Sequence, residues 1–226
     1  MRTDSANTAS IASLFSGAPL STRSFIWLRW WLTPYREIAA VLPSSGRILD
    51  LGSGHGLLSL ALSMGSDQRE VIGIDHDQAR GRLAERAGAR RGSLSKPKFE
   101  VGDLEKALAT FAPVSLSGIA MIDILHYLAP DSQAALLREA ARALEPGGIL
   151  AVREVDPDGG VAAVWNRLYE NVATRIGFTQ SARADLEFRS VAGWTRMLET
   201  AGFDVRSEPC GSPLFSDVLF IARRPG

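Results

Sequence analysis

The sequence predicts an α/β protein built on a doubly wound, mostly parallel, seven-stranded sheet. Short apolar runs alternate with helical stretches from residue 46 to about residue 156. These runs are continuously apolar, as expected of parallel strands that are covered on both faces. Glycines at positions 52, 54 and 56 join the first apolar run to a helical stretch, which is typical of a tight turn from a strand into a helix.

Each element follows from its local pattern. Strands are predicted at 48–51, 71–75, 99–103, 118–122, 149–155, 203–208 and 217–223. Helices are predicted at 34–42, 57–64, 77–90, 104–111, 131–144, 161–176 and 190–201. Thr33 and Asp131 are expected to be N-caps, and residues 145–148 (Glu-Pro-Gly-Gly) are expected to form a type II turn. The link 209–216 is short, so the last two strands are expected to pair antiparallel at the sheet edge.

Length and composition favour one soluble domain, residues 1–226. We divide it into an N-terminal helical cap (1–45), a ligand-binding core (46–156) and a C-terminal part with helices and the hairpin (157–226). Lys and Arg total 25, as do Asp and Glu, so no positive field favours nucleic acid. The single cysteine, Cys210, favours a reducing, cytoplasmic location without a cysteine metal cluster. The most apolar run, 25–32, is far shorter than the roughly 20 residues of a transmembrane helix.

The glycine turn predicts a ligand site. A loop that enters a helix N-terminus presents free N–H groups and the positive end of the helix dipole. Dinucleotide-binding turns follow G-x-G-x-x-G, but here the third glycine comes one residue early and Leu57 holds the dinucleotide position. The spacing therefore argues against a nicotinamide cofactor.

Together with Asp50, the string Asp-Leu-Gly-Ser-Gly-His-Gly at 50–56 resembles the first motif of the class I S-adenosylmethionine (SAM)-dependent methyltransferases. Further matches follow in order: Asp75 ending the second strand, Gly-Asp-Leu at 102–104, the segment 121–128 and Glu-Pro-Gly-Gly at 145–148. The resemblance implies the strand order 3-2-1-4-5-7-6. It also implies SAM as the cofactor, S-adenosylhomocysteine as the product and no metal.

The resemblance assigns roles to individual residues. It places the cofactor against the turn residues Asp50, Gly52, Ser53, Gly54 and Gly56. It implies that Asp75 accepts the ribose hydroxyls beside His76, that Asp103 and Leu104 contact adenine, and that Asp123 lies near the methionine part. Alternatives from the residues alone are that Asp75 caps the next helix and that Asp103 is the N-cap of 104–111. His55 is expected either to reach the cofactor carboxylate or to cap the helix after the turn, and we favour the cap.

His126 is the candidate general base, because the resemblance places the fourth motif beside the transferable methyl group. A base is needed only where the acceptor must lose a proton early. The alternative is that His126 belongs to a packed segment of the fold, as in many relatives.

The acceptor side is predicted from the aromatic segment 25–35, which contains Trp27, Trp30 and Trp31. This segment is expected to be a helix packed on the sheet, a lid over a lipid-like or aromatic acceptor, or a peripheral membrane contact that includes Arg29. The string Arg-Trp-Trp-Leu-x-Pro at 29–34, which precedes the glycine turn, resembles small bacterial methyltransferases found with lipid-like or polyene secondary metabolites. After the fifth strand, a set of polar and aromatic residues either orients the acceptor or forms a salt-bridged strand end: Arg153, Glu154, Asp156, Trp165, Asn166 and Tyr169.

The favoured hypothesis is SAM-dependent O- or C-methylation of a small, apolar or aromatic molecule. A non-catalytic SAM-binding or assembly protein and a nicotinamide oxidoreductase remain as alternatives. An RNA methyltransferase would need a basic face, but the arginines at 80, 82, 86, 90 and 91 are interleaved with Glu85 and favour a solvated surface.

Overall fold

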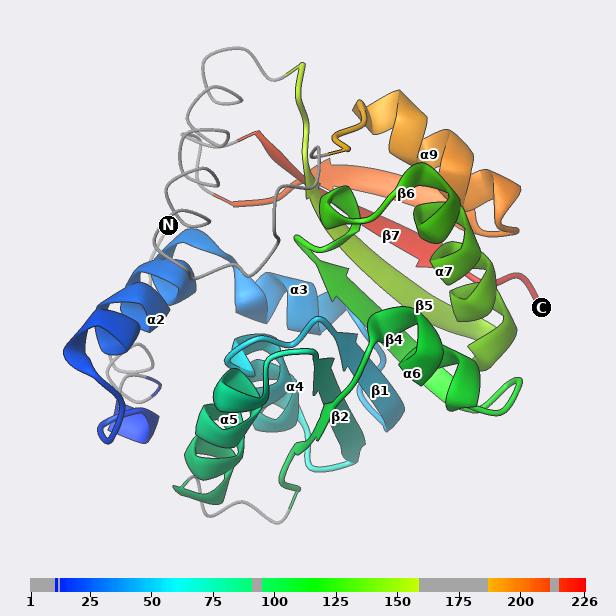
Figure 1. Ribbon diagram of the computed structural model, residues 1–226. Coiled ribbons are helices and arrows are strands. Elements are labelled where there is room, and N and C mark those ends of the chain that lie inside the picture. The colour runs from blue at the N-terminus through cyan, green and yellow to red at the C-terminus, as the bar shows by residue number, and fades with distance from the viewer. Residues whose placement is uncertain (1–10, 12, 91–94, 159–186, 212–215) are drawn as a thin grey trace.

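The computed structural model, which describes residues 11, 13–90, 95–158, 187–211 and 216–226, is centred on a seven-stranded sheet (Figure 1). The strands are β1 (Gly46–Leu51), β2 (Arg69–Asp75), β3 (Lys98–Val101), β4 (Leu116–Ile122), β5 (Leu144–Val155), β6 (Asp204–Pro209) and β7 (Asp217–Arg223). Their order is β3-β2-β1-β4-β5-β7-β6. Strands β1 to β5 are parallel, and β7 runs antiparallel to both β5 and β6. The predicted fold class, strand order and terminal hairpin are confirmed.

Helices cover both faces of the sheet. They are α2 (Leu20–Leu32), α3 (Tyr35–Val41), α4 (Leu57–Gly65), α5 (Gln78–Arg90), α6 (Leu104–Thr110), the 3₁₀ turn η1 (Leu125–Tyr127), α7 (Pro130–Ala143) and α9 (Val191–Thr200). Figure 1 shows α6, α7 and α9 together on one face. Successive strand residues point to opposite faces: Ala120 and Ile122 join the core under α3 and α4, whereas Ile119 and Met121 join the core under α6, α7 and α9. Both faces are therefore buried, which explains the continuously apolar strands.

Two predicted helix caps are wrong. Thr33 ends α2 instead of starting the next helix: its N–H donates to the Arg29 carbonyl at 2.9 Å, and Pro34 takes the N-cap position of α3. Asp131 lies in the first turn of α7, whose N-cap is Ala129 and whose first residue is Pro130. Proline suits that position because the N–H that it lacks would have no helical partner there.

The remaining boundaries differ from the predictions by a few residues. Strand β5 begins at Leu144, before the predicted turn, and Gly147 has the positive φ of 80° that a type II turn requires at its third position. Ser190 precedes α9 as its N-cap, with its hydroxyl accepting the Gly193 N–H at 3.2 Å. The predicted helix 161–176, with Trp165, Asn166 and Tyr169, lies outside the described residues. No helix in the described part of the chain combines the length and apolar character needed to cross a membrane.

Candidate active site

In the turn between β1 and α4, all three glycines adopt the left-handed backbone conformation, but they serve two different purposes. Gly52, Gly54 and Gly56 have φ values of 78°, 54° and 73°. A Cβ at Gly52 would lie 2.5 Å from Ile124, and one at Gly56 would lie 2.6 Å from the Phe99 ring. A Cβ at Gly54 would meet nothing within 4 Å. Gly52 and Gly56 therefore permit close packing, whereas Gly54 leaves open space in front of the backbone.

Asp75 holds this turn in place from the end of β2. Its Oδ2 accepts the Gly54 N–H at 2.8 Å, and its Oδ1 accepts the Asp77 N–H at 2.9 Å. The side chain is buried, yet it lines a cavity with its neighbour His76. Each carboxylate oxygen has a second acceptor site, so both remain able to accept a hydroxyl. The structure thus adds a loop-fixing task to the predicted ribose contact, which stays a prediction.

Asp103 and Leu104 follow β3 and line the same cavity. Asp103 is also the N-cap of α6, because its Oδ1 accepts the Lys106 N–H at 3.0 Å. The capping contact occupies one carboxylate oxygen and is compatible with the predicted adenine contact.

Asp50 is the buried carboxylate beneath the turn. It is 2% exposed and accepts the Ser59 hydroxyl at 2.6 Å. Burial raises its pKa to about 6, although the Ser59 hydrogen bonds oppose that shift. The charged form is therefore penalised in the ligand-free protein, and a cationic ligand in the cavity would relieve this penalty.

We expect Asp50→Asn to stabilise the ligand-free protein at pH 8 by about 3 kcal/mol, the equivalent of a shift of about two pKa units. The folded pKa lies above the unfolded one, so the stability that Asp50 contributes is lost as pH rises through about 6. The gain should therefore disappear near pH 4. Thermal unfolding at both pH values measures it, with exposed Asp204→Asn as the control. A lower midpoint for Asp50→Asn at pH 8 would show that the buried charge is not penalised.

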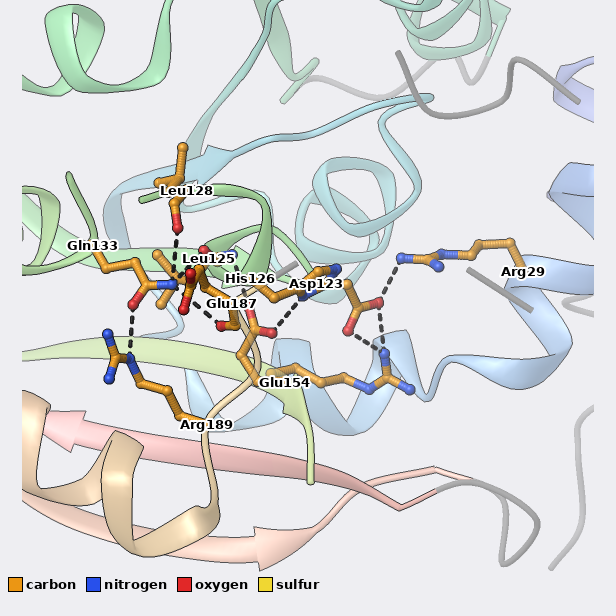
Figure 2. Close-up of polar contacts among 10 residues, drawn as sticks. Arg29, Asp123, Leu125, His126, Leu128, Gln133, Glu154, Glu187 and Arg189 are labelled. Atoms are coloured by element: carbon orange, nitrogen blue, oxygen red, sulfur yellow. Dashed lines mark hydrogen bonds and ion pairs between the residues drawn. The ribbon is translucent and has the colours of Figure 1, made fainter. Parts of the chain in front are cut away.

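Asp123 directly follows β4 and pairs with two arginines of the site. It has a positive φ of 55°. Arg153 of β5 donates to both carboxylate oxygens, at 2.5 and 2.6 Å, and Arg29 of α2 donates to Oδ2 at 2.5 Å (Figure 2). Arg153 also contacts Asp217 of β7. Burial favours a higher pKa for Asp123, but the two arginines outweigh it and the net pKa is lowered.

His126 lies in η1, directly after this charge cluster, and is fully buried. Its Nδ1 is 2.6 Å from Oε2 of Glu154, whose Oε1 accepts the Leu125 N–H at 2.8 Å. Its ring stacks on Phe188 with centroids 5.1 Å apart. The cavity is lined by the next residue, Tyr127, and His126 is not among its lining residues. The contacts match the packed-segment alternative, and the catalytic role stays a prediction.

A second set of contacts fixes the segment that follows His126. Gln133 donates to the carbonyls of Leu125 and Leu128, at 3.0 and 3.1 Å, and accepts from Arg189 at 2.8 Å (Figure 2). Glu154 and Gln133 together hold the backbone that places Tyr127 and Leu128 in the cavity wall. With Arg153 on Asp123, this matches the salt-bridged strand-end alternative for Arg153 and Glu154.

These elements enclose one cavity of about 340 Å³ at the carboxyl ends of β1, β2, β3 and β4. It brings together nearly all of the predicted cofactor residues: Asp50, Gly52, Ser53, Gly54, Asp75, His76, Asp103, Leu104 and Asp123. Gly56 is not among the lining residues, because it packs on Phe99 and Ala84. The strand order reverses between β1 and β4, so Asp50 and Asp123 flank the switch point, and α/β proteins bind their ligands outside the carboxyl ends of the strands there.

The structure adds cavity residues that the sequence did not assign to the cofactor: Phe25, Arg29, Tyr35, His55 and Arg80. Burial lowers the pKa of His55 to about 4, helped by Arg80, so His55 is neutral at pH 7. Its side chain does not cap α4, which has Gly56 at its N-cap and no side-chain cap bond. Arg80 pairs with Asp77 at 3.2 Å. The expected solvated surface therefore holds for Arg82 and Arg86 but not for Arg80.

The aromatic segment of α2 divides between the cavity and the surface. Trp30 stacks on Tyr35 with centroids 5.4 Å apart, and Arg29 faces Asp123, so neither suits the predicted membrane contact. Trp27 and Trp31 are 52% and 50% exposed. For these two residues the peripheral contact stays a prediction.

The cavity fits a cationic nucleoside ligand. The open space at Gly54 allows close approach to the backbone, and carboxylates from four strand ends converge on one volume. A doubly wound sheet with this turn is typical of nucleoside-binding α/β proteins. The carboxylates of the site suit SAM, whose sulfonium is positive.

A family model matches the part of the chain that contains the glycine turn and strands β1 to β4. Residues 48–148 match the profile of a family described as methyltransferase domain. The match assigns residues 48–148 to a SAM-dependent methyltransferase domain, which implies SAM as the cofactor and not a nicotinamide. No curated protein matches the chain.

Three solved structures share the fold. A SAM-dependent methyltransferase from Methanosarcina mazei is 22% identical with a TM-score of 0.62, over 86% of this chain and 99% of that one. A chain from a complex between the Haloferax volcanii Trm112 methyltransferase activator and a methyltransferase is 18% identical with a TM-score of 0.70, over 95% of this chain and 94% of that one. The mitomycin 7-O-methyltransferase MmcR is 21% identical with a TM-score of 0.70, over 95% of this chain and 60% of that one. At these identities the likeness shows the fold alone.

Proposed function

We propose that this protein methylates a small, apolar or aromatic acceptor on oxygen or carbon. The observation that carries the proposal is the aromatic and apolar part of the cavity wall. Its side chains come from α2, α3, η1 and the residue after η1: Phe25, Tyr35, Tyr127 and Leu128. The cavity volume of about 340 Å³ lies in the range of small-molecule sites.

The chain's own residues bind and position the reactants. SAM held by these residues would supply an electrophilic methyl group on sulfur for in-line displacement by the acceptor, with S-adenosylhomocysteine as the leaving group. The carboxylates of Asp50, Asp75 and Asp123 favour the positive charge on the cofactor side. The aromatic wall excludes water and aligns the acceptor with the methyl carbon. Such positioning is worth effective molarities of roughly 10⁵ M or more.

His126 is proposed as the proton acceptor where the methylated group is a hydroxyl. Its pairing with Glu154 supports this, because a carboxylate on Nδ1 orients an imidazole and stabilises its protonated form. The full burial of His126 weighs against direct access, so the proposal requires the acceptor to reach Nε2 through the wall beside Tyr127. For an acceptor that is already ionised, the pair acts only by positioning η1.

We expect release of S-adenosylhomocysteine from SAM with a phenol or an apolar hydroxyl compound, and none with RNA. For a phenol, His126→Asn should lower kcat by about 10²-fold or more and remove its rise with pH, because a base is lost. For a carboxylic acid it should lower kcat little. A rise in KM alone, equal for both acceptors, would assign His126 to positioning.

The same assay separates the non-catalytic alternative. Binding of S-adenosylhomocysteine without turnover of any acceptor class would favour a SAM-binding or assembly protein. Turnover with RNA alone would overturn the small-molecule proposal. A cytoplasmic location and a role in secondary metabolism remain proposals; the single cysteine supports the first and the resemblance of the segment before the turn supports the second.

A further inference from the structure

The ion pair between Arg29 and Asp123 is the polar contact between the N-terminal cap and the end of β4. The two side chains meet at 2.5 Å, and both line the cavity (Figure 2). Arg29 is 22% exposed and Asp123 is 6% exposed. The pair therefore lies at the cavity wall, with Arg29 on its open side.

Asp123 is anchored independently of Arg29. Arg153 reaches both of its oxygens from β5, and Asp217 holds Arg153 from β7. These three residues belong to hydrogen-bonded strands of one sheet. Arg29 belongs instead to α2, which joins the cluster from outside the sheet. Asp123 is thus the fixed partner and Arg29 the exchangeable one.

The strand order says which end of the cofactor reaches this pair. Asp103 and Asp75 follow β3 and β2, on one side of β1, whereas Asp123 follows β4 on the other side. A ligand with its nucleoside at the ends of β3 and β2 extends across the glycine turn towards Asp123. The end that arrives there is the amino-acid part, with a carboxylate and an ammonium on one carbon.

We propose that Arg29 and Asp123 exchange their mutual ion pair for the amino-acid end of the cofactor, Arg29 donating to its carboxylate and Asp123 accepting from its ammonium. Charge balance supports the exchange: a partly buried cation and a buried anion each receive an opposite charge, so neither is left unpaired. Arg153 keeps Asp123 ionised throughout. The inference concerns the cofactor and is independent of the acceptor proposed above.

The exchange has a consequence for the acceptor wall. Phe25 lies one turn before Arg29 on α2, and Tyr35 begins the next helix. A cofactor bound to Arg29 therefore contacts α2, the helix that also carries Phe25 of the aromatic wall. A ligand without the amino-acid end leaves the ion pair intact and makes no such contact.

Calorimetric binding of two ligands tests the exchange. S-adenosylhomocysteine carries the amino-acid end, and 5′-methylthioadenosine has the same nucleoside and sulfur without it. We expect Arg29→Met to weaken the binding of S-adenosylhomocysteine by about tenfold to a hundredfold, the range for a lost charged hydrogen bond. The affinity for 5′-methylthioadenosine should change by no more than about twofold. Arg29→Lys should restore part of the loss.

Arg23→Met is the matched control, because Arg23 is an exposed arginine of the same helix. It should leave both affinities unchanged. Equal weakening of the two ligands by Arg29→Met would show that Arg29 only holds α2 in place. Unchanged binding of S-adenosylhomocysteine would show that Arg29 stays on Asp123. Either result overturns the exchange, while leaving the proposed methyl transfer untouched.

Discussion

Arg153→Met is expected to lower the free energy of unfolding by about 3–5 kcal/mol, the range for removing one partner of a buried charge cluster. The arginine is 4% exposed and lies between Asp123 and Asp217, both also buried. Burial favours a lower pKa for Arg153, but the two carboxylates outweigh it and the net pKa is raised. Methionine would leave Asp217 without its arginine, and Asp123 with Arg29 alone.

Thermal and urea unfolding at pH 7 measure this loss, at roughly 2–4 °C per kcal/mol for a chain of this size. Arg47→Met is the matched control: Arg47 also lies on a strand and pairs with Glu70, but both side chains are more than 40% exposed. It should cost at most about 1 kcal/mol. A loss for Arg153→Met no larger than the control would mean that the cluster contributes little.

The pH dependence of the unfolding free energy is a second test of the Arg153→Met prediction. In the wild type the pKa of Asp123 is depressed, so the stability it contributes is present above its unfolded pKa and is lost as pH falls through the folded one. Without Arg153, burial raises that pKa instead. The difference between variant and wild type should therefore be largest at neutral pH and shrink in acid, as the carboxylates become protonated.

The sheet could be predicted because its determinants are local. Buried parallel strands are short and apolar, and each helix between them has its own pattern. The errors fall where neighbouring elements compete. Thr33 had the right chemistry for an N-cap, but its N–H completes α2. Asp131 was displaced by Pro130, which fits the first helical position better.

That the residues assigned to the cofactor lie around one cavity could be predicted for the same reason, because they sit at strand ends; their contact with SAM stays a prediction. The rest of the site depends on contacts between distant segments. Arg29 and Asp123 are 94 positions apart, and His126 and Glu154 are 28 apart. The available signal was a single arginine within an aromatic helical segment, at 29, between Trp27 and Trp30. An arginine that is only partly exposed in such a segment favours a carboxylate partner, and Asp123 provides it.

Gly56→Ala is expected mainly to lose stability and Gly54→Ala mainly to lose cofactor binding, although the two glycines belong to one turn. At Gly56 a methyl group would enter the core against Phe99 and Ala84, at 2.6 and 2.9 Å, with left-handed strain added. We expect a loss of about 2–5 kcal/mol in stability. The folded fraction should keep its affinity for S-adenosylhomocysteine, because Gly56 does not line the cavity.

At Gly54 the same methyl group meets open space, so stability should fall only by the left-handed strain of about 1–2 kcal/mol. Affinity for S-adenosylhomocysteine should fall by about tenfold or more, about 1.4 kcal/mol, because the methyl group projects into the cavity. Gly202→Ala is the control: its φ is 96°, its Cβ meets nothing within 4 Å, and it does not line the cavity. It should show the strain without the loss of binding. Unchanged affinity for Gly54→Ala would place the cofactor away from the turn, because no ligand in contact with that backbone can share its space with a methyl group.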